Sequence, residues 1–351
     1  MEKIKAIISK IKPLDKGAMK KARDRLDNLT KPFNSLGRLE EIAERVSGIR
    51  GQLAPVIKQR VIFTLAGDHG VVAEGVSAYP SEVTSQMVYN FAKGGAGINV
   101  LAGHIGARVI VIDMGVAADL KPHPKIVNKK IAYGTKNIAK GPAMTYEQAI
   151  QSIKIGIKLV EDEFSKGVDI IGGGDMGIGN TTSSSAITSA ITGAKIREVT
   201  GHGTGIDNAM LEHKIKIIKQ ALKINQPDSK DPLDVLAKVG GFEIGGLVGI
   251  ILAGAAHRIP VVLDGFIVGA AGLIAYSLAP QVKDYLFAAH CSIENGHKII
   301  LEKMGLKPLF NLGLRLGEGT GAALGISIIE AAAKILNEMA TFEEASVSKK
   351  L

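Results

Sequence analysis

The sequence predicts an α/β fold: a Rossmann-like, doubly wound, mostly parallel six-stranded sheet, with a small helical domain built from both termini. Short apolar runs recur along the chain without polar alternation and end in glycine or a polar residue, which is typical of parallel strands covered on both faces. Helical patterns separate these runs, and this alternation implies a doubly wound sheet. The 351 residues, 46% of them apolar, can bury the core such a sheet needs.

Six apolar runs are the candidate strands. In chain order they are VIFTLAGDHG from Val61, RVIVIDMG from Arg108, VDIIGGGD from Val168, PVVLDG from Pro260, YLFAAHCS from Tyr285 and PLFNLG from Pro308. Ligands of parallel sheets bind beyond the carboxyl ends of the strands. We therefore expect the polar residues after these runs to converge on one rim. They are Asp68, His69, Asp113, Asp175, Asp264, His290, Ser292, Arg315 and Glu318.

Helices are predicted between the strands from apolar residues at helical spacing. The predicted helices cover residues 81–91, 146–164, 212–222, 243–257 and 321–339. The first 50 residues contain no strand-like run. Their apolar residues follow helical spacing from Leu39 to Ile49, with Ser35 as the expected N-cap, and the lysine–isoleucine alternation of the N-terminus predicts an amphipathic helix. We expect residues 1–50 and 326–351 to form the small helical domain and residues 51–325 the large catalytic domain.

The amino-acid composition limits the kinds of molecule that the protein is expected to bind. Lys and Arg total 43 against 34 for Asp and Glu, a net charge of +9, but the bases are spread along the chain and aromatic residues make up 4%. This pattern argues against nucleic acid and suits a small anionic substrate. The apolar run from Leu247 to Ala256 is too short to span a membrane. Because Cys291 is the single cysteine, no intrachain disulfide can form, and we expect a cytoplasmic protein.

Two glycine-rich turns are candidate anion sites. Gly172, Gly174 and Gly177 have GxGxxG spacing between a strand and a helix, as in dinucleotide-binding turns. Asp175 inside that turn would repel a pyrophosphate, whereas the hydroxyl and amide side chains from Asn180 onward suit a single phosphate at a helix start. The alternative is that the glycines of this first turn serve a tight turn alone.

The second turn, GHGTGID, contains Gly203 and Gly205 and is followed by Lys214 on the next predicted helix. Two donor-rich turns and a lysine favour anion binding.

Other polar clusters leave alternatives open. Asp68 and His69 suggest a catalytic dyad, a metal site or a hydrogen-bonded histidine at a strand end. Tyr79, Gln86 and Met87 could line a flat pocket for an aromatic ring, with Met87 in the core as the alternative. His290, Glu294 and His297 loosely resemble a metal triad, but Asn295-Gly296 argues against a regular helix there. We expect neither a metal nor a cofactor.

The stretch LGLRLGEGTGAALG, from Leu312 to Gly325, places Glu318 among glycines and small apolar residues. Desolvation raises the pKa of a carboxyl toward the range in which it exchanges protons with a substrate. Glu318 is therefore the candidate proton acceptor.

Taken together, the chain resembles the family of nicotinate-nucleotide:dimethylbenzimidazole phosphoribosyltransferases, which make the lower-ligand nucleotide of cobamides. The resemblance is carried by LTKPFNSLGRLEEIA, AGDHGVVAEGVSAYPSEVTSQMV, GGGDMGIGNTT, GTGID, PVVLDGF and NLGLRLGEGTGAALG, which are distributed from Leu29 to Gly325. The chain departs from the family at Asp175, where glutamate is usual, and at Phe33-Asn34, where Pro-Gly is usual. The second departure implies a local loop difference.

The resemblance implies transfer of 5-phosphoribose from nicotinate mononucleotide to 5,6-dimethylbenzimidazole or a related base, in a homodimer. It implies that Glu318 is the general base and that Asp175 assists catalysis. The implied phosphate and nucleotide contacts are Gly174, Gly177, Asn180, Thr181, Gly203, Gly205, Lys214, Asp264, Ser292 and Arg315. The implied base pocket consists of Ser77, Ala78, Tyr79, Gln86, Met87 and Leu316. The competing hypotheses are a nicotinamide-dinucleotide oxidoreductase built on the GxGxxG turn and a non-catalytic nucleotide-binding paralogue.

Overall fold

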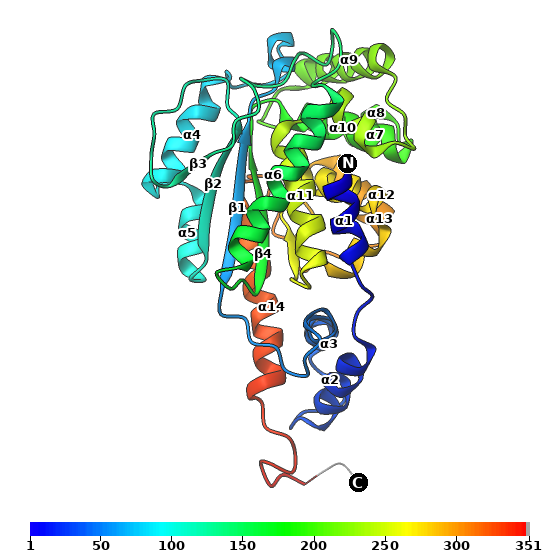
Figure 1. Cartoon of the computed structure of the whole chain (residues 1–351). Helices are drawn as coiled ribbons and strands as arrows, with labels where there is room; N and C mark the ends of the chain where they lie inside the picture. Colours follow the sequence, from blue (N-terminus) through cyan, green and yellow to red (C-terminus); the bar gives the residue numbers. More distant parts are fainter. Residues whose placement is uncertain (349–351) are drawn as a thin grey trace.

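Six parallel strands form the centre of the molecule in the computed structural model, which describes residues 1–348 (Figure 1). The strands are β1 (Arg60–Gly67), β2 (Arg108–Gly115), β3 (Ile126–Asn128), β4 (Ile170–Met176), β5 (Val261–Leu263) and β6 (Leu286–Ala288). Their order across the sheet is β3-β2-β1-β4-β5-β6, and every neighbouring pair is parallel. The chain runs from β1 to one edge and returns through β4 to the other. The predicted doubly wound sheet of six strands is confirmed.

One predicted strand was wrong and one strand was missed. The run from Pro308 contributes a single parallel bridge between Phe310 and His290 in place of a strand. Proline has no amide to donate to a ladder, and this segment continues past the ends of the strands. The sixth strand is β3, which pairs with β2 over three residues. So short a run, flanked by lysines, gives no periodicity from which it could be predicted.

Helices cover the sheet and extend beyond it. They are α1 (Glu2–Lys10), α2 (Lys16–Asn28), α3 (Arg38–Arg50), α4 (Glu82–Lys93), α5 (Gly97–His104), α6 (Tyr146–Phe164), α7 (Asn180–Thr192), α8 (Ile196–Val199), α9 (Asn208–Asn225), α10 (Pro232–Val239), α11 (Phe242–Ala256), α12 (Phe266–Leu278), α13 (Asn295–Met304) and α14 (Thr320–Glu338), with 3₁₀ helices η1 (Gly70–Glu74) and η2 (Pro280–Tyr285). The predicted helices correspond to α1, α3, α4, α6, α9, α11 and α14. None of the helices among residues 1–348 is long and apolar enough to cross a membrane.

The start of α3 differs from the prediction. The cap residue is Gly37, with φ +53°, and Ser35 lies in the turn before it. The carboxylate of Glu40 accepts the Leu36 amide at 3.1 Å, a role that a capping side chain would otherwise fill. In the same turn Asn34 has φ +56°, a conformation that asparagine tolerates better than most residues.

The two ends of the chain pack in different places. Helix α1 lies against α11, and Lys3 bonds Glu161 of α6 at 2.9 Å, so the first residues pack with the large part of the molecule. Helices α2 and α3 pack together against α14, which extends from the sheet towards them (Figure 1). The division into two domains stays a prediction, and residues 349–351, the end of the predicted small domain, lie outside the described residues.

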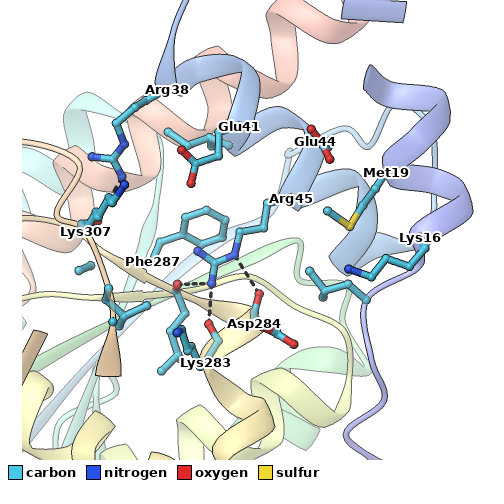
Figure 2. A pocket seen from close by; sticks show the side chains of 16 residues that line it. Lys16, Met19, Arg38, Glu41, Glu44, Arg45, Lys283, Asp284, Phe287 and Lys307 are labelled. Atoms are coloured by element: carbon cyan, nitrogen blue, oxygen red, sulfur yellow. Dashed lines mark hydrogen bonds between the residues drawn. The ribbon is translucent and has the colours of Figure 1, made fainter. Parts of the chain in front are cut away.

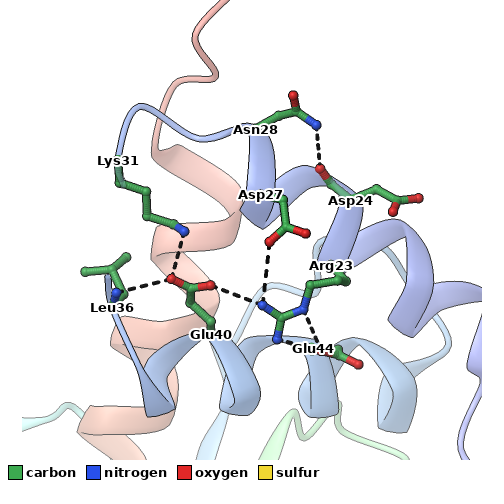
Figure 3. Close-up of polar contacts among 8 residues, drawn as sticks. All are labelled: Arg23, Asp24, Asp27, Asn28, Lys31, Leu36, Glu40 and Glu44. Carbon is green, nitrogen blue, oxygen red and sulfur yellow. Dashed lines mark hydrogen bonds and ion pairs between the residues drawn. The ribbon is translucent and has the colours of Figure 1, made fainter. Parts of the chain in front are cut away.

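A buried ion cluster joins α2 to α3 (Figure 3). The side chain of Glu40 is 2% exposed and bonds Lys31 Nζ at 2.7 Å and Arg23 Nη1 at 3.1 Å. Arg23 also contacts Glu44 at 2.8 Å and Asp27 at 3.7 Å. Because a buried carboxylate is costly unless it is paired, this cluster fixes how the two helices meet.

Helix α11 is buried along its length because glycines let α6 approach closely. A Cβ added to Gly249 would lie 2.0 Å from the carbonyl oxygen of Ile153, and one added to Gly245 would lie 1.9 Å from Ser152 Oγ. The glycines at this spacing therefore serve close helix packing. Helix α11 also packs against β1, β2 and β4.

Candidate active site

A cavity of about 670 Å³ opens beyond the carboxyl ends of β4, β5 and β6. Its walls come from the loops after these strands, the start of α7, one face of α4 and the loop that leads into α14. The expected site residues that line it are Tyr79, Met87, Asp175, Gly177, Asn180, Thr181, Gly203, Ser292, Arg315, Leu316 and Glu318. Further lining residues include Val83, Thr204, His290 and Glu294. The structure thus brings the catalytic, phosphate and base-pocket candidates to one cavity.

Other expected residues do not line this cavity. They are Gly174, Gly205, Lys214, Asp264, Ser77, Ala78 and Gln86. Gln86 is exposed on α4, whereas Lys214 and Asp264 are each 1% exposed and lie behind the lining. Ser77 and Ala78 contact Thr204 at the rim, with the Ala78 amide donating to Thr204 Oγ1 at 3.1 Å.

The carboxylate of Glu318 is 4% exposed and held on one side. Its Oε2 accepts the backbone amide of Ile98 at 3.0 Å, at the start of α5. Burial raises the pKa of Glu318 above its ordinary value, while the amides of Ile98 and Gly97 act in the opposite direction. One oxygen is therefore fixed by the protein, and the second is left for a molecule in the cavity.

The backbone at Glu318 is strained and heavily supported. Gly317, Glu318 and Gly319 have φ values of +83°, +65° and +98° in succession, a region that a residue other than glycine adopts at a cost. Thr64 Oγ1 of β1 donates to the Glu318 carbonyl at 2.9 Å, and the Glu318 amide donates to the Asp175 carbonyl at 3.2 Å. Strands β1 and β4 thus hold the Glu318 backbone directly.

Asp264, after β5, completes this support. Its Oδ2 accepts the Gly319 amide at 3.1 Å and its Oδ1 accepts the Ala322 amide at 3.0 Å, so it caps the first turn of α14. Burial raises the pKa of Asp264 to about 7 even though these amides favour its charged form. With both oxygens engaged, Asp264 faces the start of α14, which directly follows the candidate base, and not the cavity.

Asp175 lies at the end of β4, beside Glu318. Its Oδ2 accepts Nδ2 of Asn180 at 2.9 Å, and its Oδ1 is buried without a hydrogen-bond partner among residues 1–348. Burial, and the nearby carboxylates of Asp264 and Glu243, raise the pKa of Asp175 well above its ordinary value. A buried acceptor without a partner is suited to a polar or cationic group of a ligand.

The other end of the cavity is built to receive an anion. Lys214 Nζ donates to Thr181 Oγ1 at 2.8 Å and to the Gly201 carbonyl at 3.4 Å, immediately behind the Gly203 turn. Burial lowers the pKa of Lys214 to about 8, although the carboxylate of Glu294 raises it. Asn180 and Thr181 begin α7, where the positive end of the helix dipole favours negative charge.

Two residues position this anion end. Glu294 Oε1 accepts the Gly203 amide at 2.9 Å and so fixes the second glycine turn. The Nδ1 of His297 accepts the Ser292 amide at 2.9 Å, and burial lowers the pKa of His297 to about 3, which keeps the imidazole neutral. Neither role could be predicted, because the His–Glu–His spacing suggested a weak metal triad and nothing else.

The GxGxxG glycines serve close packing. A Cβ on Gly174 would lie 2.2 Å from the Glu318 carbonyl oxygen, and one on Gly177 would lie 2.1 Å from the Gly67 carbonyl oxygen. Gly172 packs against Ala322 of α14. This turn therefore brings β4 against the base-bearing loop, which supports the alternative of glycines required by the turn.

The Asp68-His69 pair lies outside the cavity and forms internal bonds. His69 Nε2 contacts Glu243 Oε1 at 2.6 Å and its Nδ1 contacts Ser183 Oγ at 2.9 Å. Asp68 accepts the Ala117 amide at 2.8 Å. Of the alternatives, the hydrogen-bonded histidine at a strand end is the one that the structure supports. Asp113 likewise bonds the Val116 amide and does not reach the expected rim.

The supports of Glu318 were the residues that sequence analysis missed. Thr64 is a single hydroxyl in an apolar run, and that break in the apolar pattern is the one signal in the sequence that could have marked it. The structure buries it completely. Gly97 and Ile98 carry no functional side chain, since their backbone amides make the contact. Backbone donors cannot be identified from residue type.

Comparisons with known proteins agree with this geometry. Residues 11–347 match the model of a protein family described as phosphoribosyltransferase. The nicotinate-nucleotide–dimethylbenzimidazole phosphoribosyltransferase of Desulforudis audaxviator is 56% identical over 349 residues, covering 99% of each chain. A Roseiflexus protein of the same name is 56% identical over 351 residues, covering 100% of this chain and 99% of the relative. The crystal structure of CobT from Thermus thermophilus has a TM-score of 0.92 at 46% identity, covering 95% of this chain and 100% of that one.

Proposed function

This chain belongs to the family of nicotinate-nucleotide–dimethylbenzimidazole phosphoribosyltransferases, and we propose from that premise how its cavity carries out the transfer. The chain is a phosphoribosyltransferase. Its substrates are nicotinate mononucleotide and 5,6-dimethylbenzimidazole or a related base, and its products are α-ribazole 5′-phosphate and nicotinate, in cobalamin nucleotide-loop assembly. The observation that supports this most directly is one cavity with a supported carboxylate at one end and an anion site at the other.

Glu318 acts as the general base. One nitrogen of the bound base attacks C1′ of the sugar while Glu318 removes the proton from the other ring nitrogen, so positive charge does not build up on the ring. The Ile98 amide holds Oε2, which leaves Oε1 for this proton. Tyr79, Met87 and Leu316 provide an apolar surface beside Glu318 that suits a flat aromatic ring.

The C1′–nitrogen bond of nicotinate mononucleotide breaks as the new bond forms on the opposite face. The leaving pyridinium nitrogen recovers the bonding electron pair and becomes neutral, so it departs without an acid. Burial raises the pKa of Asp175 in the empty cavity, but the positive charge of the bound pyridinium ring and of the developing sugar cation favours the charged form of its carboxyl. The unpartnered Oδ1 would then offset the positive charge on the sugar. The reaction balances without a cofactor.

The 5′-phosphate is held at the other end of the cavity by Thr181, Ser292 and the Gly203 turn, with the charge of Lys214 behind them. Binding energy from this remote group orients C1′ between the two rings. Arg315, which lines the cavity, adds a further positive charge.

Incubation with nicotinate mononucleotide and a panel of benzimidazoles, purines and phenols tests the proposal. We expect release of nicotinate and a product whose mass equals that of the base plus that of nicotinate mononucleotide minus that of nicotinate, identified by mass spectrometry. An enzyme that binds the nucleotide but never releases nicotinate with any of these bases would contradict the proposal and support the non-catalytic alternative.

The dinucleotide alternative has little support from the geometry. Gly174 and Gly177 pack against backbone carbonyls, and Asp175 occupies the turn that a pyrophosphate would need. Thermal melts with NAD and with nicotinate mononucleotide separate the two ideas, since a ligand of the native state raises the melting temperature. We expect a shift with the mononucleotide alone.

We also propose a homodimer in the cytoplasm, as the family resemblance implies. The chain carries exposed apolar side chains that a partner subunit would cover, among them Phe33 and Leu312 at 68% and 65% exposure. Sedimentation velocity of the purified chain tests the dimer. A single monomeric species at micromolar concentration would contradict it.

A further inference from the structure

A second cavity, of about 380 Å³, lies between the helices α2 and α3 and the strand β6. It shares no lining residue with the candidate active site. Figure 2 shows Arg45 of α3 inside it, with charged side chains from several elements around its guanidinium group. No step of the proposed reaction uses these residues.

Arg45 is held in a fixed position. Its Nε donates to the carbonyl of Asp284 at 3.0 Å, and its Nη2 donates to the carbonyls of Lys283 and Leu286 at 2.5 and 2.7 Å (Figure 2). The guanidinium lies over the ring of Phe287, 4.5 Å from the ring centre. These contacts leave Nη1 without an acceptor among residues 1–348, so a ligand can approach in the plane of the guanidinium at that edge.

The charge of Arg45 has no close counter-ion. Within residues 1–348 no carboxylate oxygen lies within 4.0 Å of it, and Asp284 and Glu41 act on it from further away. Burial lowers the pKa of Arg45 to about 10, so the group is charged at neutral pH. A partly buried cation without a paired carboxylate loses favourable hydration and gains little electrostatic attraction in exchange. A bound anion would supply that attraction.

The other charges around the cavity give it an excess of positive charge. The cationic side chains beside Arg45 are Lys16, Arg38, Lys283 and Lys307, and the acidic ones are Glu41, Glu44 and Asp284. Glu44 is already paired with Arg23 at 2.8 Å. Lys16, Lys283 and Lys307 form no ion pair with the described residues, and they come from three separate segments of the chain.

We propose that this second cavity binds a phosphate group, either inorganic phosphate or a phosphate monoester, at the Nη1 edge of Arg45. Cations that surround a point from several directions favour a tetrahedral, multiply charged oxyanion over a flat carboxylate, which is satisfied by one planar fork. The volume leaves room for an organic part attached to the phosphate.

Isothermal titration with inorganic phosphate at constant ionic strength tests the proposal on the full-length chain. The active site also binds phosphate under the proposed function, so the unmodified chain should bind two phosphates and Lys214→Gln should bind one. Adding K16Q, K283Q and K307Q to Lys214→Gln should weaken the remaining site at least about ten-fold. The matched control adds K125Q, K219Q and K223Q, which remove the same charge from other exposed positions, and should leave that affinity unchanged.

Each outcome separates the two proposals. If Lys214→Gln binds no phosphate, or if both lysine triples weaken binding equally, the second site does not exist and the attraction is general. If Lys214→Gln still binds two phosphates, the proposed phosphate role of Lys214 fails and the second site stands. Arg45→Lys, which keeps the charge but loses the planar fork, should weaken binding too, and circular dichroism checks that it is folded. Equal affinity for succinate would overturn the assignment to phosphate.

Discussion

At the scale of single residues, the proposed site depends on the two carboxylate oxygens of Glu318. One oxygen bonds the protein, and the other is left for the substrate. Glu318 gives Oε2 to the Ile98 amide, and its left-handed backbone is held by Thr64 and Asp175. A strained backbone conformation at a functional residue persists only where several surrounding contacts hold it in place. These contacts therefore set the direction of the free oxygen.

Replacing Glu318 by Gln should remove the base while keeping its shape. We expect the rate of nicotinate release to fall roughly 10²–10⁴-fold, the usual contribution of a placed general base, with little change in the affinity for nicotinate mononucleotide. Steady-state kinetics gives the first quantity and calorimetry the second. Full activity in this variant would remove Glu318 from its role.

The pKa of Lys214 gives a prediction about pH. Burial lowers this pKa to about 8, and in the proposed site the charged form is the one that attracts the phosphate. The kcat/KM for nicotinate mononucleotide should therefore fall as the pH rises through about 8, by up to ten-fold per pH unit. Lys214→Arg is the control, since arginine stays charged and should show no fall in this range. A flat wild-type profile between pH 7 and 9.5 would contradict the assignment.

Residue types predicted part of the site. Glu318, Asp175 and Asn180 could be identified because a carboxylate or amide among glycines after an apolar run is chemically unusual. Thr64 and the Ile98 amide could not, since their roles depend on which segments the fold brings together. Contacts made by backbone groups have no signature in the sequence.

At the scale of elements, the start of α14 links the sheet to the reaction. Asp264, which follows β5, accepts the amides of Gly319 and Ala322, directly after the proposed base. The helix therefore begins at a point fixed by the sheet. Three successive left-handed residues before it would otherwise leave the Glu318 loop free to move.

Removing this cap should affect catalysis more than binding. In Asp264→Ala we expect a lower kcat with a nearly unchanged KM for the nucleotide, and a loss of about 0.5–2 kcal/mol in the free energy of unfolding, the usual contribution of a capping side chain. Asp264→Asn, which keeps one acceptor oxygen, should recover part of the kcat. Wild-type kcat in the alanine variant would show that the cap does not position Glu318.

The ion cluster between α2 and α3 predicts a pair of stability changes. Glu40→Ala leaves Lys31 buried without its partner, so the free energy of unfolding should fall by about 3–5 kcal/mol. Glu44→Ala removes a partly exposed partner of Arg23 and should cost less than about 1 kcal/mol. Urea unfolding of both variants measures the difference, and equal losses would mean that burial of Glu40 does not matter.

Elements were predictable where the pattern was long. The helix over 146–164 and the strand run from Arg108 match α6 and β2 because each spans enough residues to show its period. The three-residue β3 and the misassigned run from Pro308 show the limit. In both places the pairing is decided by neighbouring segments and not by local composition.

At the scale of the whole molecule, one helix connects the predicted domains. Helix α14 starts beside Glu318 and ends against α2 and α3, and residue Leu29 pairs with Thr341 in an isolated antiparallel bridge. Helix α14 thus packs against both the terminal helices α2 and α3 and the sheet. Alternating strands and helices predicted the sheet, but this shared packing depends on contacts far apart in the sequence.

We therefore expect the chain to unfold in a single transition. Far-UV circular dichroism reports helix content, and the fluorescence of a probe bound at the nicotinate mononucleotide site reports the active-site cavity. Both signals should change at the same urea concentration. Agreement of the two midpoints is the expected result. A separate early loss of helix signal would mean that the terminal helices form an independently stable domain.

The hydrogen bond between Ile98 and Glu318 joins residues 220 positions apart, and it has a consequence for protein synthesis. The two glycine turns proposed to hold the phosphate are translated more than a hundred residues before Glu318, the proposed base. A nascent or prematurely terminated chain that ends before Glu318 therefore lacks the proposed proton acceptor, whatever it has already folded. If Glu318 is the base, the site therefore becomes active only after this residue has been translated and has docked against β1 and β4, however early the two glycine turns have folded.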